Sequence, residues 1–116
     1  MRMVAQVLVG VIAALHVWFL VMEMFLWTRP LGLKTFGQTR EEAEKSAVLA
    51  ANQGLYNGFL AAGLVWGLIA PGRTVETFFL GCVLFAGVFG GLTAKRSILF
   101  VQALPAALAL VVLWAS

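Results

Sequence analysis

The sequence predicts an all-α integral membrane protein, a bundle of four transmembrane helices that forms oligomers. Of its 116 residues 62% are hydrophobic and only 11% are charged, whereas a soluble domain carries about 25% charged residues. The mean hydropathy is +0.98. Because a membrane-crossing helix needs about 20 apolar residues, the chain has room for four spans joined by short turns. We therefore expect one domain, residues 1–116, with spans at about 3–27, 48–70, 75–92 and 97–115.

The first span is too long for a secretory signal peptide, whose apolar region is roughly 7–15 residues. It also contains Glu23, so we expect it to be a genuine transmembrane helix. It should end before Pro30, because proline disfavours the helical conformation at the preceding residue. Trp27 at this end is typical of an interfacial anchor, and residues 31–38 are expected to form a loop.

The second span has a clear start signal. Thr39 and Glu42 have the spacing of a capping box, and Glu41 and Lys45 are placed to pair at i,i+4. No helix-breaking residue separates this polar turn from the apolar residues that follow, so one helix should run from about residue 40 to 70. Such a helix exceeds the hydrocarbon thickness of a bilayer, and its first turns should stand outside it.

The remaining two spans are shorter. Pro71-Gly72 ends the second helix, and Lys95-Arg96 mark the turn between the third and fourth spans. Pro105 lies inside the fourth span, where its missing N–H removes one backbone hydrogen bond. We expect one helix over residues 97–115 with a kink at this proline.

Basic residues indicate the orientation in the membrane. Arg2 and Arg73 fall on one side, and the other six fall on the opposite side. The excess belongs on the cytoplasmic side, so the loops at 29–47 and 93–97 are predicted to be cytoplasmic and both termini to lie outside. The basic residues form no run, which argues against binding of nucleic acid. Cys82, the single cysteine, has no partner for an intrachain disulfide.

Glycines recur at four-residue spacing, which lets helix backbones approach closely in membranes. The pairs are Gly54/Gly58, Gly63/Gly67 and Gly87/Gly91. The first two pairs lie on nearly opposite faces of the second helix, at 100° per residue. We therefore expect this helix to be central and packed on both sides, and glycine-lined faces to support oligomerisation.

Polar side chains gather at one depth of the predicted bundle. His16 and Glu23 are seven residues apart and share one face of the first helix. By the rise of a helix, Asn52 lies near the depth of Glu23, and Tyr56 and Asn57 lie between Glu23 and His16. An ionisable group inside a span is expensive and suggests a function. The shared depth predicts a polar pocket between the first two spans, open toward the cytoplasm.

We assign roles to these residues from their chemistry. The candidate catalytic residues are His16, Glu23 and Tyr56, and the candidate ligand contacts are Asn52, Gln53, Asn57, Trp27 and Gln102. Burial favours the neutral forms of carboxyl and imidazole groups, so Glu23 and His16 form a possible proton donor–acceptor couple. The structural alternative is that the amides only join helices, Glu23 pairs with Arg29 or Lys95, and His16 bonds a backbone carbonyl.

Haem is the one cofactor with which the sequence is compatible. A haem iron needs one axial imidazole and an apolar slot, and His16 stands beside Trp18, Phe19 and Met22. In this reading His16 is a metal ligand of haem b. Metal-binding clusters, phosphate-binding loops and catalytic Ser or Cys motifs are absent from the sequence.

These same residues carry a family resemblance. His16, the run Glu23 to Trp27 and the run Ala50 to Gly63 (AANQGLYNGFLAAG) resemble a small bacterial membrane family known as domain of unknown function 1304. The resemblance covers essentially the whole chain. It implies a four-helix protein of the bacterial inner membrane and brings no activity with it.

Three looser analogies suggest mechanisms. The MAPEG family of eicosanoid and glutathione metabolism has four helices, a polar second helix and trimers with sites between subunits, which implies a homodimer or homotrimer here. The chain lacks that family's Arg-Ala-His-x-Asn-x-x-Glu pattern, which argues against glutathione. Styrene oxide isomerase is a four-helix enzyme that uses haem b. Small multidrug transporters have a glutamate in the first span, but they lack a counterpart of Asn52 to Asn57.

Our leading hypothesis is that the pocket binds a small lipophilic molecule, with isomerisation of that molecule by acid/base or haem chemistry as an extension. One alternative is a proton-coupled transporter of the small-multidrug type. The other is a structural membrane protein without a ligand. Whether the protein is an enzyme is left open by the sequence.

Overall fold

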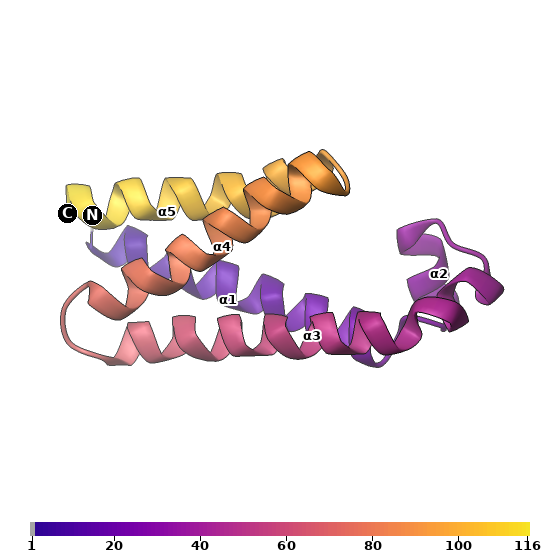
Figure 1. Ribbon diagram of the computed structural model, residues 1–116. Helices are drawn as coiled ribbons and strands as arrows, with labels where there is room; N and C mark the ends of the chain where they lie inside the picture. The colour runs from indigo at the N-terminus through magenta and orange to yellow at the C-terminus, as the bar shows by residue number, and fades with distance from the viewer. Residues whose placement is uncertain (1) are drawn as a thin grey trace. The chain divides into compact units, whose positions relative to one another are not determined.

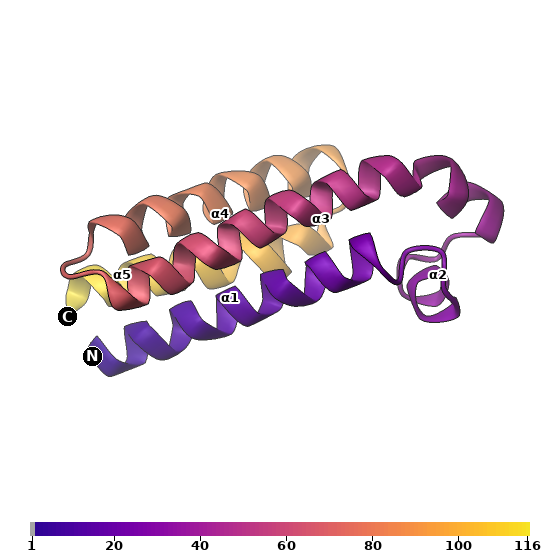
Figure 2. The ribbon, with the colours of Figure 1, turned by 90° about the horizontal axis from the view of Figure 1, so that it is seen from below.

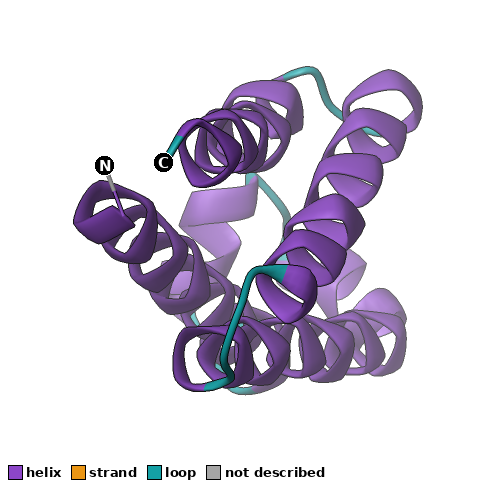
Figure 3. Ribbon diagram, turned by 90° about the vertical axis from the view of Figure 1, so that its left-hand side faces the viewer, coloured by secondary structure: helices purple, strands orange, loops and turns teal. Residues whose placement is uncertain are grey.

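The computed structural model describes residues 2–116, and they are helical apart from short connections. The helices are α1 (Arg2–Met24), α2 (Pro30–Phe36), α3 (Arg40–Ile69), α4 (Thr74–Thr93), the π-helix η1 (Leu99–Ala103) and α5 (Leu104–Ala115) (Figures 1 and 2). No strand occurs in this part of the chain (Figure 3). The predicted all-helical class is therefore confirmed.

The chain divides into two compact units, which we describe separately. One comprises Ala14–Ala61, and the other comprises the chain up to Ala13 together with Ala62–Ser116. Helices α1 and α3 each contribute to both units.

The unit Ala14–Ala61 turns sharply between α1 and α3. Helix α1 ends at Met24, a little before the predicted end at Trp27. The backbone N–H groups of Phe25 and Leu26 both donate to the carbonyl of Val21, at 3.0 and 3.1 Å. This shared acceptor breaks the helical register and starts the turn.

The loop predicted at residues 31–38 is wrong, because Pro30–Phe36 form the short helix α2 (Figure 1). Pro30 stands at its start, where a missing N–H costs nothing. Gly37 ends it with a left-handed backbone at φ 62°, which glycine adopts without steric cost. The pattern was misread because a seven-residue helix shows too little periodicity to stand out from a loop.

The start of α3 is confirmed in detail. The backbone N–H of Thr39 donates to Glu42 Oε1 at 2.8 Å, and the N–H of Glu42 donates to Thr39 Oγ1 at 3.1 Å. This is the reciprocal bonding of a capping box. Lys45 Nζ lies 3.5 Å from Glu41 Oε1, as predicted for the i,i+4 pair.

Glycines set the helix contacts within each unit. A Cβ atom at Gly54 would lie 3.1 Å from Glu23 Cβ, and one at Gly58 would lie 2.7 Å from Leu20 Cδ1, so α1 packs directly on this face of α3. In the second unit, Cβ atoms at Gly63 and Gly67 would meet Phe79 and Glu76 of α4. The prediction that this helix packs on two faces is confirmed.

Helix α4 runs beside η1 and α5 in the second unit (Figures 1 and 2). A Cβ atom at Gly87 would lie 2.5 Å from the backbone nitrogen of Ala103, so these two backbones touch. The buried side chains between the helices are small or branched, and comprise Leu80, Val83, Ala103, Ala106, Ala109 and Leu113. The glycine pairs that we expected at an oligomer surface thus serve packing within the chain.

The fourth predicted helix is divided by a change of hydrogen-bond register. Residues Leu99–Ala103 form a π-helix, and the N–H of Leu104 donates to the carbonyl of Leu99. Pro105 then occupies the start of α5. The proline ring would clash with the carbonyl four residues earlier in a continuous α-helix, and the wider π turn moves that carbonyl away.

Two helices, α1 and α4, are long and apolar enough to cross a membrane. Helix α3 is not among them, and Asn52, Gln53 and Asn57 interrupt its uncharged part. The apolar segment Leu99–Ala115 is shorter than a typical span.

The contact at Gly87 can be tested against a glycine of the same helix. We expect Gly87→Ala to destabilise the protein by about 1–3 kcal/mol, because the added methyl meets backbone that cannot rotate away. Gly81 has nothing within 4 Å of its Cβ position, so Gly81→Ala should stabilise α4 by up to about 1 kcal/mol. Thermal unfolding in detergent, followed by circular dichroism, measures both; equal effects would contradict the close contact.

The capping box predicts a pH dependence at the start of α3. The backbone N–H and the side chain of Thr39 hold the pKa of the Glu42 carboxyl below its ordinary value of 4.5. Because the folded pKa is the lower one, this stabilisation is complete above the unfolded pKa and is lost as the pH falls through the folded pKa. The N–H groups of Thr39 and Glu42 make these two bonds, so their amide-exchange protection, corrected for intrinsic rates, should drop below about pH 4.

Glu42→Gln provides the control for this titration. Its side-chain oxygen can still accept from Thr39, but it does not ionise in this range. Its protection should therefore stay flat with pH, and a drop equal to that of the parent protein would show that another group is responsible.

Candidate functional site

A short polar contact in the unit Ala14–Ala61 joins α1 to α3. Asn57 Nδ2 donates a hydrogen bond to Glu23 Oε1, at 2.5 Å. Asn57 is buried and Glu23 is half-buried. The structure therefore pairs Glu23 with Asn57, whereas helical rise placed Asn52 nearest the depth of Glu23 and Asn57 between Glu23 and His16.

Local packing explains why these two side chains meet. Glu23 lies in the last turn of α1, and Asn57 lies about one turn beyond Gly54 on α3. Gly54 has no side chain to hold α1 away, since a Cβ there would crowd Glu23 Cβ and Leu20 O. The close approach of the backbones brings the Glu23 carboxyl within reach of the short Asn57 amide.

His16 lies two helical turns before Glu23 on the same face of α1, about 10 Å away along the axis. It is fully buried, and its ring stands edge-on to Phe19 with centroids 5.3 Å apart. The imidazole is thus enclosed by the protein itself.

Asn52, Gln53 and Tyr56 lie on α3 before Asn57 and are exposed. The Tyr56 side chain is 55% exposed and packs edge-on against Phe59, with ring centroids 5.6 Å apart. The contact of these three side chains with a ligand stays a prediction.

Trp27 and Gln102 occupy other places. Trp27 Nε1 donates to Ser46 Oγ at 3.1 Å, and its ring lies 4.9 Å from that of Phe36, so it ties the end of α1 to α2 and α3. Gln102 lies in η1 and is half-buried. It belongs to the second unit, whereas Glu23 and Asn57 belong to the unit Ala14–Ala61.

A second buried carboxylate was missed by the sequence reasoning. Glu76 in the first turn of α4 is only 1% exposed. Arg2 Nη2 lies 3.4 Å from its Oε1 and donates to the carbonyl of Gly72 at 3.2 Å. The sequence signal for this pair is depth, because helical rise places Glu76 near Arg2 on the side of the bundle that holds Arg2 and Arg73.

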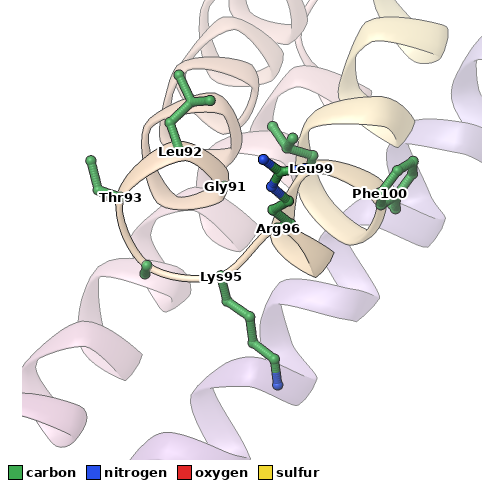
Figure 4. Close-up of a pocket in the computed structure, with 8 residues that line it drawn as sticks. Gly91, Leu92, Thr93, Lys95, Arg96, Leu99 and Phe100 are labelled. Carbon is green, nitrogen blue, oxygen red and sulfur yellow. The ribbon is translucent and has the colours of Figure 1, made fainter.

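A hollow on the second unit contains none of the predicted site residues (Figure 4). It has a volume of about 390 Å³ and lies where α4 ends. Its lining consists of Gly91, Leu92, Thr93, Ala94, Lys95, Arg96, Leu99 and Phe100. Lys95 and Arg96 stand just past the last carbonyls of α4, where positive charge interacts favourably with the helix dipole.

Metal chemistry has little support in the described residues. Within residues 2–116 no group of three or more His, Cys, Asp or Glu side chains could hold a metal ion. Haem needs only one imidazole, but that imidazole must face an open slot. The buried His16 ring has Phe19 against it, so this arrangement does not fit haem and we derive no step through it.

Comparisons with known proteins agree with the resemblance drawn from the sequence. The family model described as "Protein of unknown function (DUF1304)" matches residues 10–114. An uncharacterized protein, YpaA, of Lactococcus lactis subsp. lactis (strain IL1403) is 26% identical over 113 residues, which cover 93% of this chain and 95% of that protein. No solved structure gives a significant match. Because the family model spans nearly all of the sequence, the chain belongs to the DUF1304 family.

Proposed function

We propose that this protein is a four-span protein of the bacterial inner membrane, and that it binds a small lipophilic molecule at the Glu23–Asn57 contact. The single observation that carries the proposal is the hydrogen bond between these two side chains on facing helices. An ionisable group within a membrane helix is costly to keep unless it serves a function.

Four segments supply the spans. Helices α1 and α4 have the length and composition. After Lys45, α3 carries no further charged residue up to Ile69, and this stretch is about 36 Å long, enough for a hydrocarbon core of about 30 Å. Helices η1 and α5 together extend about 26 Å. The loops at 29–47 and 93–97 are then cytoplasmic, because they hold most of the basic residues.

The chemistry of the contact favours a ligand with a polar head and an apolar body. Glu23 is only half-buried, and a carboxylate has more acceptor positions than Asn57 fills. A hydroxyl, amine or amide head of a ligand would bond the remaining oxygen positions. The surroundings are apolar side chains and membrane, which suit the rest of a lipophilic molecule.

His16 extends the proposal toward catalysis. It lies deeper on the same helix face as Glu23, and neutral imidazole accepts a proton at one nitrogen. In an isomerisation, Glu23 would give a proton to one position of the ligand, and a base would remove one from another. The enclosed ring of His16 makes binding the primary proposal and isomerisation its extension.

Native mass spectrometry of protein purified from membranes tests the proposal through the organic molecules that it retains. Glu23→Gln should reduce the retained fraction about tenfold or more, since a hydrogen bond to a charged group contributes roughly 1.5–3 kcal/mol. Asn57→Ala should reduce the retained fraction to a similar extent, because the Glu23 carboxylate then loses the hydrogen bond that holds it in position. Glu44→Gln is the matched control, because Glu44 is an exposed glutamate of α3 outside the contact. Equal retention by Glu23→Gln and the parent protein would overturn the assignment.

A further inference from the structure

The hollow at the end of α4 is positively charged, and no acidic residue of its unit lies near it. Lys95 and Arg96 are both exposed in its lining (Figure 4), and neither forms an ion pair with another described residue. Glu76 is the only acidic residue in the sequence of the second unit. It lies about 26 Å from Thr93 along α4, well beyond the roughly 8 Å over which exposed charges interact at physiological salt.

The helix dipole of α4 balances only part of this charge. A helix C-terminus carries about half a negative elementary charge, whereas Lys95 and Arg96 bring two positive charges. An excess of about one and a half positive charges is therefore left at the hollow, and it favours an anionic ligand.

A second hollow, on the unit Ala14–Ala61, provides a contrast. It is lined by Arg40, Glu41, Glu44 and Lys45, so two carboxylates balance its two cations, and Lys45 Nζ lies 3.5 Å from Glu41 Oε1. Its lining contains no apolar side chain. Unbalanced positive charge and apolar side chains thus distinguish the hollow at the end of α4.

Apolar side chains border the two cations. Leu92 is 75% exposed and Phe100 is 69% exposed, and both line the hollow. The volume of about 390 Å³ lies within the range of small-ligand sites, about 300–1,000 Å³. An anion that carries hydrocarbon therefore matches this lining better than a free anion does.

We propose that this hollow binds the headgroup of an anionic phospholipid, such as phosphatidylglycerol, in the cytoplasmic leaflet. Basic sites on this side of membrane proteins bind anionic headgroups. The Arg96 guanidinium, which lies between Gly91 and Leu99 in Figure 4, donates two parallel hydrogen bonds to the phosphate, and Lys95 adds a point charge. The lining has no carboxylate for the ammonium group of phosphatidylethanolamine. The proposal rests on the four-span topology proposed above and is independent of the ligand at Glu23.

Native mass spectrometry of the delipidated protein, titrated with phosphatidylglycerol or phosphatidylethanolamine of identical acyl chains, tests this site. The protein should bind phosphatidylglycerol more tightly. Arg96→Gln should raise the dissociation constant for phosphatidylglycerol about fivefold, which is the effect of one basic residue near an anionic headgroup. Arg40→Gln is the matched control, because Arg40 is an exposed arginine on the same predicted side but does not line this hollow. Equal affinity for the two lipids, or equal effects of the two substitutions, would overturn the proposal.

Competition separates a lipid from a free anion as the ligand. Inorganic phosphate should displace no more phosphatidylglycerol than chloride does at equal ionic strength, because phosphate has no hydrocarbon to contact Leu92 and Phe100. Displacement of the lipid by phosphate but not by chloride would overturn the assignment to a phospholipid.

The two proposed sites fail separately, because they belong to different units. Glu23→Gln should leave the affinity for phosphatidylglycerol unchanged, and Arg96→Gln should leave the retained lipophilic molecule unchanged. A preference for phosphatidylglycerol with unchanged ligand retention in Glu23→Gln would overturn only the Glu23 site. Ligand lost in Glu23→Gln, with equal affinity for the two phospholipids, would overturn only the headgroup site.

Discussion

The hydrogen bond from Asn57 to Glu23 is the interaction on which the unit Ala14–Ala61 depends. A carboxyl group inside an apolar chain needs a donor close by, because its desolvation is not repaid otherwise. Asn57 can serve only if the two helix backbones are near each other, and Gly54 and Gly58 allow that approach. The carboxylate of Glu23 on α1 therefore explains the residue types at three positions of α3, which are Gly54, Asn57 and Gly58.

The second unit also contains a buried carboxylate that is bonded to a donor from another helix. Glu76 is buried against Gly67, whose Cβ position would lie 2.7 Å from Glu76 Cγ, and its donor is the guanidinium of Arg2. Each of these two carboxylates thus packs against a glycine of α3 and bonds a donor from another helix. The long α3, with glycines on two faces, is the element that both arrangements share.

Much of this arrangement could be predicted from the sequence. Caps, i,i+4 pairs and glycine spacing are local signals, so the start of α3 and its packing on two faces were predictable. The depth of Glu23 and Asn57 follows from helical rise alone. Two local features were harder to predict. The short helix α2 depends on Pro30 at its start and Gly37 at its end. The π-helix before Pro105 depends on how the chain relieves the clash between the proline ring and the carbonyl four residues earlier.

The directions of side chains were the least predictable feature. Helical rise places Asn52 near the depth of Glu23, but depth says nothing of rotation about the helix axis, and the neighbours of Gly54 fix that rotation. Glu76 carries no local signal of burial, because a glutamate in the first turn of a helix is favoured there by the helix dipole whether or not it is buried. Its burial depends on Arg2, which is distant in sequence.

A double-mutant cycle at Glu23 and Asn57 tests the central interaction most directly. The free energy of unfolding in detergent would be measured for Glu23→Ala, Asn57→Ala and the double variant. If the hydrogen bond holds α1 against α3, the two effects are non-additive, with a coupling energy of about 0.5–3 kcal/mol. Additive effects, within about 0.3–0.5 kcal/mol, would contradict the account.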